Sequence, residues 1–313
     1  MHHDTQRTSG GGGIGVAPPD ALLTGVLPCV TCGYELRGLS VRDVCPECGT
    51  AVRATILSVV DPLADELAPL RAPSLTGVLI VAWALASALG VWLILAMRLL
   101  DGLRAMGVRA PEFWWGWNAT FVLLIVSGVS SLGFLTPTTR TRPRGVLAAS
   151  LATLAYMPFF YALVRIRAID VDQGVLRAFF TLDPDPARIA WRLVCGVCLL
   201  VIFLGVRPNA RELVRRSLAM RTGRVDRQTL LAMAAAVGVM MTGDALRLVG
   251  TTTGVQEAVI VGGIAVLIAT VFLAFGLSAA VVDGWRIRRS LRMGPRRIGD
   301  LIASPETPGR GSD

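Results

Sequence analysis

The chain has 313 residues, of which 53% are hydrophobic and only 17% charged. A soluble domain carries about 25% charged residues, so this composition is typical of membrane proteins. The net charge of +9 comes entirely from arginine, since the sequence contains no lysine. The two histidines, His2 and His3, both lie in the first few residues. This placement argues against histidine acid–base catalysis, metalloprotease chemistry and haem ligation within the membrane.

The first 73 residues divide into three segments before the first long apolar run. Residues 1–27 are rich in glycine and proline, so we predict a disordered tail without a cleaved signal peptide. Residues 28–52 hold four of the six cysteines. Residues 53–73 are interrupted by three prolines and are predicted to be a juxtamembrane linker.

The four cysteines form two Cys-x2-Cys pairs separated by twelve residues: Cys29, Cys32, Cys45 and Cys48. Four thiolates at this spacing can surround one zinc ion tetrahedrally, with Zn–S bonds of about 2.3 Å. Because all four ligands come from cysteine, no coordination position remains for water or substrate. We therefore predict one structural rather than catalytic Zn²⁺.

Other readings of this cluster are two disulfides, a reduced loop without metal, or a rubredoxin-like iron site. Disulfides are disfavoured in the cytoplasm, and a segment this small has little core to fold without a metal. Gly33 and Gly49 follow the two pairs and can adopt the backbone angles that each turn needs. The connecting residues 33–44 are expected to form a β-hairpin, with Tyr34, Leu36 and Leu39 covering the metal.

The run CGYELRGL at residues 32–39, closed by CPECG at residues 45–49, resembles the N-terminal zinc ribbon of many uncharacterised bacterial multi-pass membrane proteins. The resemblance covers about 21 residues, together with the order of ribbon first and helices after it. One departure is Val30-Thr31, where a proline is often seen, and it leaves the ligands unchanged. The resemblance implies zinc and a membrane location but no activity.

Long uncharged stretches follow, and four of them contain 20 to 27 residues between charges. About 20 apolar residues cross the hydrocarbon of a bilayer. Two further stretches must accommodate a charge, namely Arg192 in one, and Asp244 with Arg247 in the other. If the two termini lie on the same side of the membrane, either both of these stretches span it or neither does. We favour six spans within a bundle at residues 74–285: 74–97, 113–135, 145–164, 189–206, 229–249 and 258–282.

The predicted fold is therefore an all-α polytopic membrane protein of about six transmembrane helices, with a small N-terminal β zinc-ribbon module. With the N-terminus inside, 22 arginines fall on the cytoplasmic side and 9 on the other. Cytoplasmic loops are enriched in positive charge. We therefore expect a multi-pass protein of the inner (cytoplasmic) membrane with both termini in the cytoplasm, ending in a basic tail at residues 286–313.

A few polar residues lie within the predicted spans. Asp244 and Arg247 are three residues apart on one helical face and could pair, and an intramembrane pair is a candidate functional site. The alternative is that both reach interfacial water near the end of their helix and stabilise packing. Cys195 and Cys198 form a third Cys-x2-Cys, but hydrocarbon opposes thiolates, so we interpret them as ordinary small buried residues.

The leading functional hypothesis is a non-enzymatic membrane protein whose zinc ribbon docks a cytoplasmic protein. Nucleic acid is disfavoured as a partner because Arg37, Arg42 and Arg53 are balanced by three nearby carboxylates. One alternative is a transporter or channel that uses Asp244, Asn118 and a helix broken at Pro158. A second alternative is a membrane enzyme, for which the sequence offers few clustered carboxylates or histidines.

Overall fold

The computed structural model describes residues 21–59, 70–111, 115–139, 141–172, 185–214, 229–292 and 301. The chain forms two compact units, one from residues 1–66 with 295–313 and the other from residues 67–294. We call the described part of the first unit the cysteine module and the second unit the helical bundle. The N-terminal residues 1–20 of the predicted tail lie outside the described residues.

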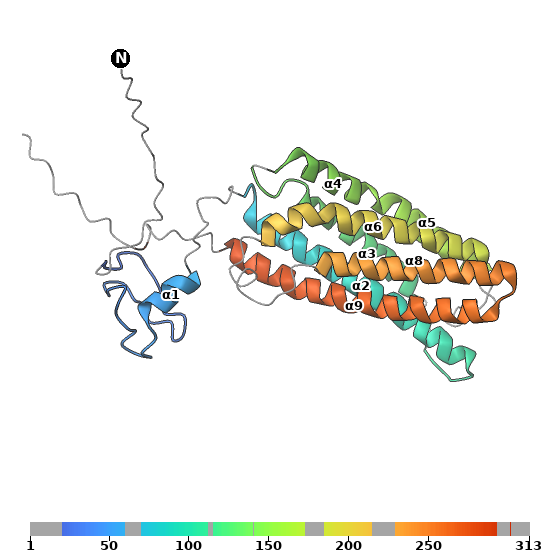
Figure 1. Ribbon diagram of the computed structural model, residues 1–313, viewed down its shortest axis with the longest axis horizontal. Helices are drawn as coiled ribbons and strands as arrows, with labels where there is room; N and C mark the ends of the chain where they lie inside the picture. Colours follow the sequence, from blue (N-terminus) through green and yellow to red (C-terminus); the bar gives the residue numbers. More distant parts are fainter. Residues whose placement is uncertain are drawn as a thin grey trace, which may run out of the picture. The chain divides into compact units, whose positions relative to one another are not determined.

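The helical bundle consists of long helices that run side by side (Figure 1). Within the described residues, six helices are long and apolar enough to cross a membrane, as predicted. The third of these spans, Pro143–Val171, comprises two helices. The helices of the bundle are α2 (Pro73–Ala105), α3 (Gly116–Ser130) with the 3-10 turn η2 (Ser131–Phe134), α4 (Pro143–Leu154), α5 (Tyr156–Asp172), α6 (Pro186–Val214), α8 (Thr229–Thr253) and α9 (Gln256–Arg292).

Prolines define where three of these helices begin. Pro73, Pro143 and Pro186 are the first residues of α2, α4 and α6, a position where proline's fixed φ suits the helix and its missing N–H costs nothing. At the start of α6, the Oδ1 atom of Asp185 accepts a hydrogen bond from the N–H of Ala187 at 2.7 Å. This is the N-cap interaction that favours aspartate before a helix.

The third span is broken near Pro158, as the sequence suggested. Helix α4 ends at Leu154 and α5 begins at Tyr156, so the break lies at Ala155. Pro158 lacks the N–H that would bond the carbonyl four residues earlier, and its ring crowds that turn. The span therefore continues beyond the break as a separate helix.

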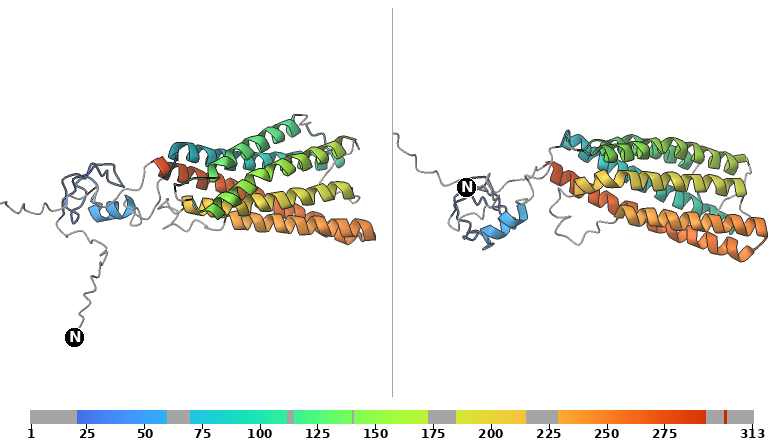
Figure 2. Two further views of the ribbon diagram at one scale, coloured as in Figure 1. Left: turned by 90° about the horizontal axis from the view of Figure 1, so that it is seen from above. Right: turned by 45° about the horizontal axis from the view of Figure 1, so that its top comes forward.

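Helix α6 packs against α4, α5 and α8, while α9 packs against both α2 and α8 (Figure 2). The closest helix contacts depend on glycine. A Cβ atom on Gly243 of α8 would lie 2.7 Å from the carbonyl oxygen of Gly262 on α9, so any larger residue would push the helices apart. In the core, the rings of Trp83 and Phe134 meet edge to face at 5.3 Å.

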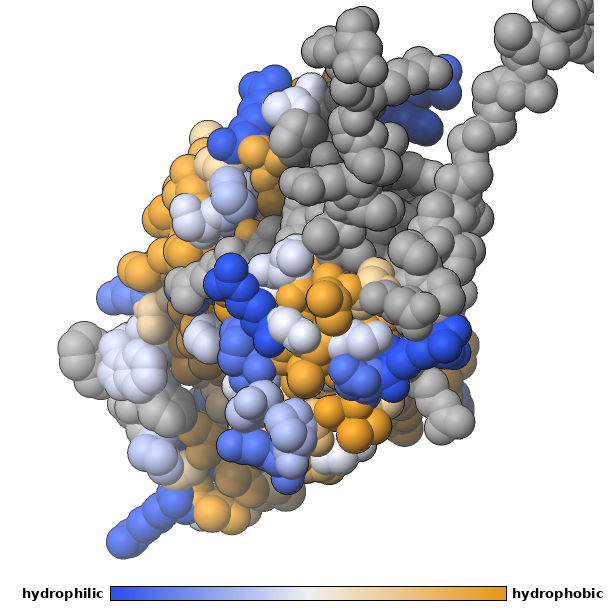
Figure 3. Space-filling view, turned by 90° about the vertical axis from the view of Figure 1, so that its left-hand side faces the viewer, coloured by the Kyte–Doolittle hydropathy of each residue, from blue (hydrophilic) through white to orange (hydrophobic). Residues whose placement is uncertain are grey.

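The outer surface of the helical bundle is apolar, as its core is. Large apolar side chains such as Val122, Leu147 and Phe272 are exposed on the outside of the bundle. The space-filling view from one end shows orange apolar side chains beside blue hydrophilic ones (Figure 3). An apolar exterior is costly in water and favourable in hydrocarbon. The bundle is therefore that of a multi-pass membrane protein.

Asn209 of α6 ties the turn between α3 and α4 to the bundle. Its buried Nδ2 donates to the carbonyl oxygens of Phe134 at 2.6 Å and Gly145 at 3.1 Å. The side chain reaches these carbonyls because residue 145 is glycine, whose missing Cβ leaves room for the amide oxygen. Sequence reasoning did not identify this residue.

Replacing Asn209 with alanine should lower the free energy of unfolding by about 1–2 kcal/mol, because two buried carbonyl oxygens lose their donor. The measurement is reversible unfolding of the detergent-solubilised protein followed by circular dichroism. Asn118→Ala is the matched control, because Asn118 is exposed on α3. Equal stability of the two variants would contradict the role of Asn209.

Candidate metal centre

The backbone of the cysteine module is held by isolated bridges rather than by continuous strands in its described residues. Leu22 pairs with Ser40, and Pro28 pairs with Glu35, both antiparallel. Residues 34–41 therefore pair with residues 21–29, which precede them, and not within themselves. The prediction of a β-hairpin inside residues 33–44 was wrong, because the turn of the hairpin is the first cysteine pair.

Each cysteine pair forms a tight turn, or knuckle, with the same hydrogen bonds. In the first knuckle the N–H of Gly33 donates to the carbonyl of Cys29 at 2.9 Å, and the N–H of Cys29 donates to the carbonyl of Tyr34 at 2.7 Å. The second knuckle, which begins at Cys45, repeats both bonds at the same lengths. Gly33 and Gly49 have φ values of 80° and 70°, a region that strongly favours glycine. The two knuckles are therefore equivalent halves of one site.

The two knuckles bring the four predicted ligand atoms together. The sulfurs of Cys29, Cys32, Cys45 and Cys48 all lie within 4.8 Å of one another. Cys29 Sγ lies 3.5 Å from Cys48 Sγ, and Cys32 Sγ lies 3.5 Å from Cys45 Sγ. A tetrahedron with bonds of about 2.3 Å has sulfur–sulfur edges of about 3.8 Å. The four sulfurs are thus spaced to hold one metal ion.

Hydrogen bonds around the sulfurs affect the thiols differently. Backbone N–H groups of Cys32 and Thr31 lower the pKa of Cys29 to about 6. The Thr50 hydroxyl and backbone N–H lower the pKa of Cys48. At Cys32 the backbone N–H of Tyr34 has a lowering effect, but desolvation and the neighbouring cysteines outweigh it and raise the pKa to about 12. Four thiolates this close repel one another, so all four ionise together only around a cation.

A small apolar core supports the knuckles and extends beyond the predicted ribbon at 28–52. Residues 21–27, which we expected to be disordered, belong to it, and so does Leu301 from the predicted basic tail. Helix α1 (Val52–Val59) occupies the start of the predicted linker and contributes Val52 and Ile56. Leu36 is buried and Leu39 partly buried, as expected, whereas Tyr34 is 39% exposed. Residues 60–69 of the linker, and 293–300 and 302–313 of the tail, lie outside the described residues.

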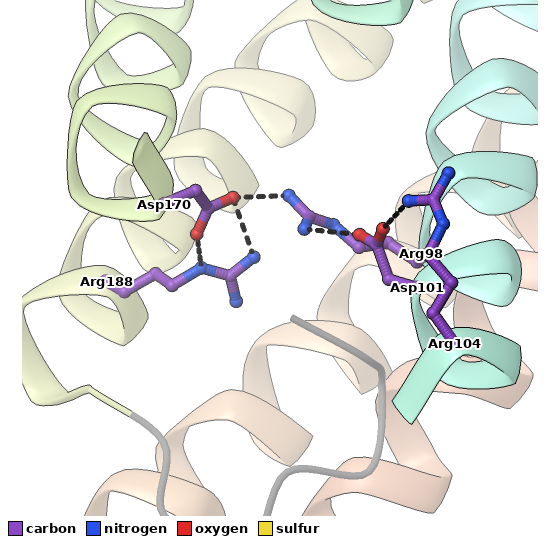
Figure 4. A network of polar contacts seen from close by, with 5 residues as sticks. All are labelled: Arg98, Asp101, Arg104, Asp170 and Arg188. Carbon is purple, nitrogen blue, oxygen red and sulfur yellow. Dashed lines mark hydrogen bonds and ion pairs between the residues drawn. The ribbon is translucent and has the colours of Figure 1, made fainter. Parts of the chain in front are cut away.

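A network of buried charges lies where α2 and α5 end and α6 begins (Figure 4). Asp170 bridges two helices, since it accepts from Arg98 Nη2 at 2.6 Å and from Arg188 Nε at 2.7 Å. Asp101 pairs with Arg98 at 3.4 Å and with Arg104 at 3.2 Å. Sequence reasoning missed this network, and only the three-residue spacing of Arg98, Asp101 and Arg104 could have indicated part of it.

Asp244 and Arg247 are buried, with 1% and 2% of their side chains exposed, so the expectation that they reach interfacial water was wrong. They approach each other only to 4.0 Å. The closer partner of Asp244 is Arg192 on α6, whose Nε donates to Oδ2 at 3.1 Å. Among the described residues, Asp244 Oδ1 and Arg247 Nε have no hydrogen-bond partner. The predicted pair is thus a triad that joins α6 to α8.

The other candidate residues occupy separate places. Cys195 and Cys198 are buried free thiols in α6, in agreement with their interpretation as packing residues. Asn118 is exposed on α3, whereas Asp244 is buried on α8, and neither residue lines the cavity that the bundle contains.

The metal site gives a direct prediction. The purified protein should contain about one zinc ion per chain, and Cys48→Ser should lose it because one of four ligands is gone. Inductively coupled plasma mass spectrometry measures the metal content. Cys198→Ser is the matched control, since this thiol is buried in the bundle and should leave the zinc content unchanged. Wild-type protein purified without chelators and free of zinc would contradict the site.

The chain matches no protein-family model, no curated protein and no solved structure. Its function is therefore inferred from its own residues.

Proposed function

We propose that this chain is a multi-pass protein of the inner (cytoplasmic) membrane that presents a zinc-stabilised docking module to a cytoplasmic protein. The observation that carries the proposal is the closed cluster of four cysteine sulfurs within 4.8 Å of one another. A closed four-sulfur shell stabilises a fold and has no open position for chemistry. The resemblance to membrane-anchored bacterial zinc ribbons supports the same conclusion.

Zinc is the metal that this donor set favours. Four thiolates in a tetrahedral arrangement suit Zn²⁺ or iron. The rubredoxin-like alternative has an aromatic-rich segment between its cysteine pairs, whereas only Tyr34 is available here, and it is partly exposed. The core of the module is also small, and domains of this size commonly depend on a metal for stability. We therefore assign the metal a structural role.

The surface of the module favours a protein partner. Five large apolar side chains are between 56% and 70% exposed: Leu22, Val26, Val30, Val44 and Leu57. Several exposed large apolar side chains on so small a module favour contact with a protein. Its described acidic and basic side chains are equal in number, three of each, which offers little to a phosphate backbone. A protein is therefore a better partner than nucleic acid.

The cytoplasmic placement rests on the arginines. The excess of 22 over 9 favours an arrangement with both termini inside. Free thiols also persist in the reducing cytoplasm, which suits a thiolate metal site. The transporter alternative retains one supporting observation, the burial of Asp244 among arginines, but its second polar residue, Asn118, is exposed on α3.

The docking role is tested by separating the surface from the metal. The double substitution Val44→Ser/Leu57→Ser removes exposed apolar side chains and leaves all four cysteines in place. We expect this variant to keep its zinc and membrane insertion but to lose the proteins that cross-link to the wild-type module in cells, measured by quantitative mass spectrometry.

Glu47→Gln is the control, because it changes an exposed charged residue between two ligands and should keep the same partners. Cys48→Ser should lose both zinc and partners. Recovery of the same cross-linked proteins from the double variant as from the wild type would refute docking through this surface, and the module would then serve only as a folded cap.

A further inference from the structure

The helical bundle contains a partly open cavity of about 200 Å³ that plays no part in the proposed docking function. Most of its wall is apolar and includes Phe159, Phe203 and Leu273 from three different helices. Cavities lined by such groups stay dry or accept apolar ligands. The space is therefore suited to hydrocarbon rather than to water.

The hydroxyl groups in the cavity wall do not make it a polar site. Ser87 Oγ lies 2.8 Å from Ser127 Oγ, which lies 2.7 Å from the Tyr156 hydroxyl. Trp83 Nε1 donates to the same Tyr156 hydroxyl at 2.9 Å. These hydroxyls hydrogen-bond to one another, so they do not require a polar ligand.

Three arginines also line the cavity: Arg98, Arg188 and Arg192. Their side chains are only 11%, 10% and 19% exposed. Arg98 comes from the end of α2, whereas Arg188 and Arg192 stand one turn apart on α6, where like charges repel. The cavity thus combines an apolar interior with a group of guanidinium cations from two helices.

Among the residues that the structure describes, arginines outnumber aspartates in the ion pairs around the cavity. Within the described residues, the ion-paired side chains around the cavity comprise five arginines and three aspartates: Arg98, Arg104, Arg188, Arg192, Arg247, Asp101, Asp170 and Asp244. Asp185 accepts hydrogen bonds from backbone N–H groups as the α6 cap, and Arg165 and Arg167 add further positive charge near this end. Buried positive charge in excess is costly unless an anion compensates it.

We propose that this cavity is a binding site for an anionic amphiphile, a single hydrocarbon chain with a carboxylate or phosphate headgroup. The headgroup binds to Arg98, Arg188 and Arg192, for which guanidinium groups have the matching geometry. The chain lies in the apolar interior. Trp117 lines the cavity beside the headgroup site, and the Arg98 guanidinium lies over its ring, 5.5 Å from the ring centroid. This proposal concerns the bundle alone and is independent of what the cysteine module binds.

The test uses the full-length protein in a neutral detergent, with ligand binding followed by native mass spectrometry. The probes are a single-chain phosphate monoester lipid, a fatty acid of equal chain length, a single-chain phosphocholine lipid and inorganic phosphate. We expect one phosphate monoester lipid or one fatty acid to bind per chain. The zwitterionic lipid and free phosphate should bind at least about tenfold more weakly, because each lacks one of the two features that the site recognises.

Two variants locate the site. Arg98→Gln/Arg192→Gln removes two of the positive charges that line the cavity. Each aspartate retains one arginine partner: Arg104 for Asp101, Arg188 for Asp170 and Arg247 for Asp244. Gly90→Leu instead fills the cavity and keeps every charge. An added Cβ at Gly90 would meet only Leu123 Cβ, at 3.9 Å, so the substitution fits the helix. Both variants should lose at least about tenfold in affinity, and Gly90→Leu should do so with unchanged thermal unfolding.

Arg104→Gln is the matched control, since it removes one charge at the same end but does not line the cavity. It should bind the anionic lipid as the wild type does. The proposal fails if Gly90→Leu and Arg98→Gln/Arg192→Gln bind like the wild type, if Arg104→Gln is equally impaired, or if phosphocholine or free phosphate binds as tightly as the anionic lipids. Should the double variant fail to fold, Gly90→Leu decides the result.

Discussion

The burial of charge inside an apolar bundle is the constraint on which much of the helix arrangement depends. Asp170 of α5 contacts Arg98 of α2 and Arg188 of α6, so one carboxylate fixes three helices relative to one another. Asp244 does the same for α6 and α8 through Arg192. In a medium of low dielectric constant, each of these groups is costly without its partner. The helices therefore have few arrangements in which all of the charges are satisfied.

Close helix contacts make this arrangement possible. Gly243 and Gly262 let α8 and α9 approach until their backbones touch, and the side chain of Arg247 packs across Gly262. Apolar packing alone distinguishes poorly between helix orientations in lipid, because lipid tails are as apolar as the helix surfaces. Small residues and ion pairs supply the distinction.

The cysteine module meets a similar constraint with different chemistry. Its buried core is small, and four sulfurs converge where a larger domain would place apolar side chains. Four thiolates repel one another without a cation, so a metal ion bound here would link metal binding to folding. Such a linkage would allow the module to be short. Large apolar side chains, such as Leu57 and Val44, are exposed on its surface.

Sequence alone determined the features that depend on local pattern. Charge-free runs of 20 or more residues predict spanning helices because a bilayer has a fixed thickness. Two Cys-x2-Cys pairs, each followed by glycine, predict a metal site because each knuckle is formed by residues adjacent in sequence. Only the tertiary structure decided which distant residues meet. Three contacts link residues that are far apart in the chain. Leu301 packs into the core of the cysteine module, Asn209 hydrogen-bonds to the α3–α4 turn, and Asp170 pairs with Arg98. No periodicity records such contacts, because they depend on how complete helices pack.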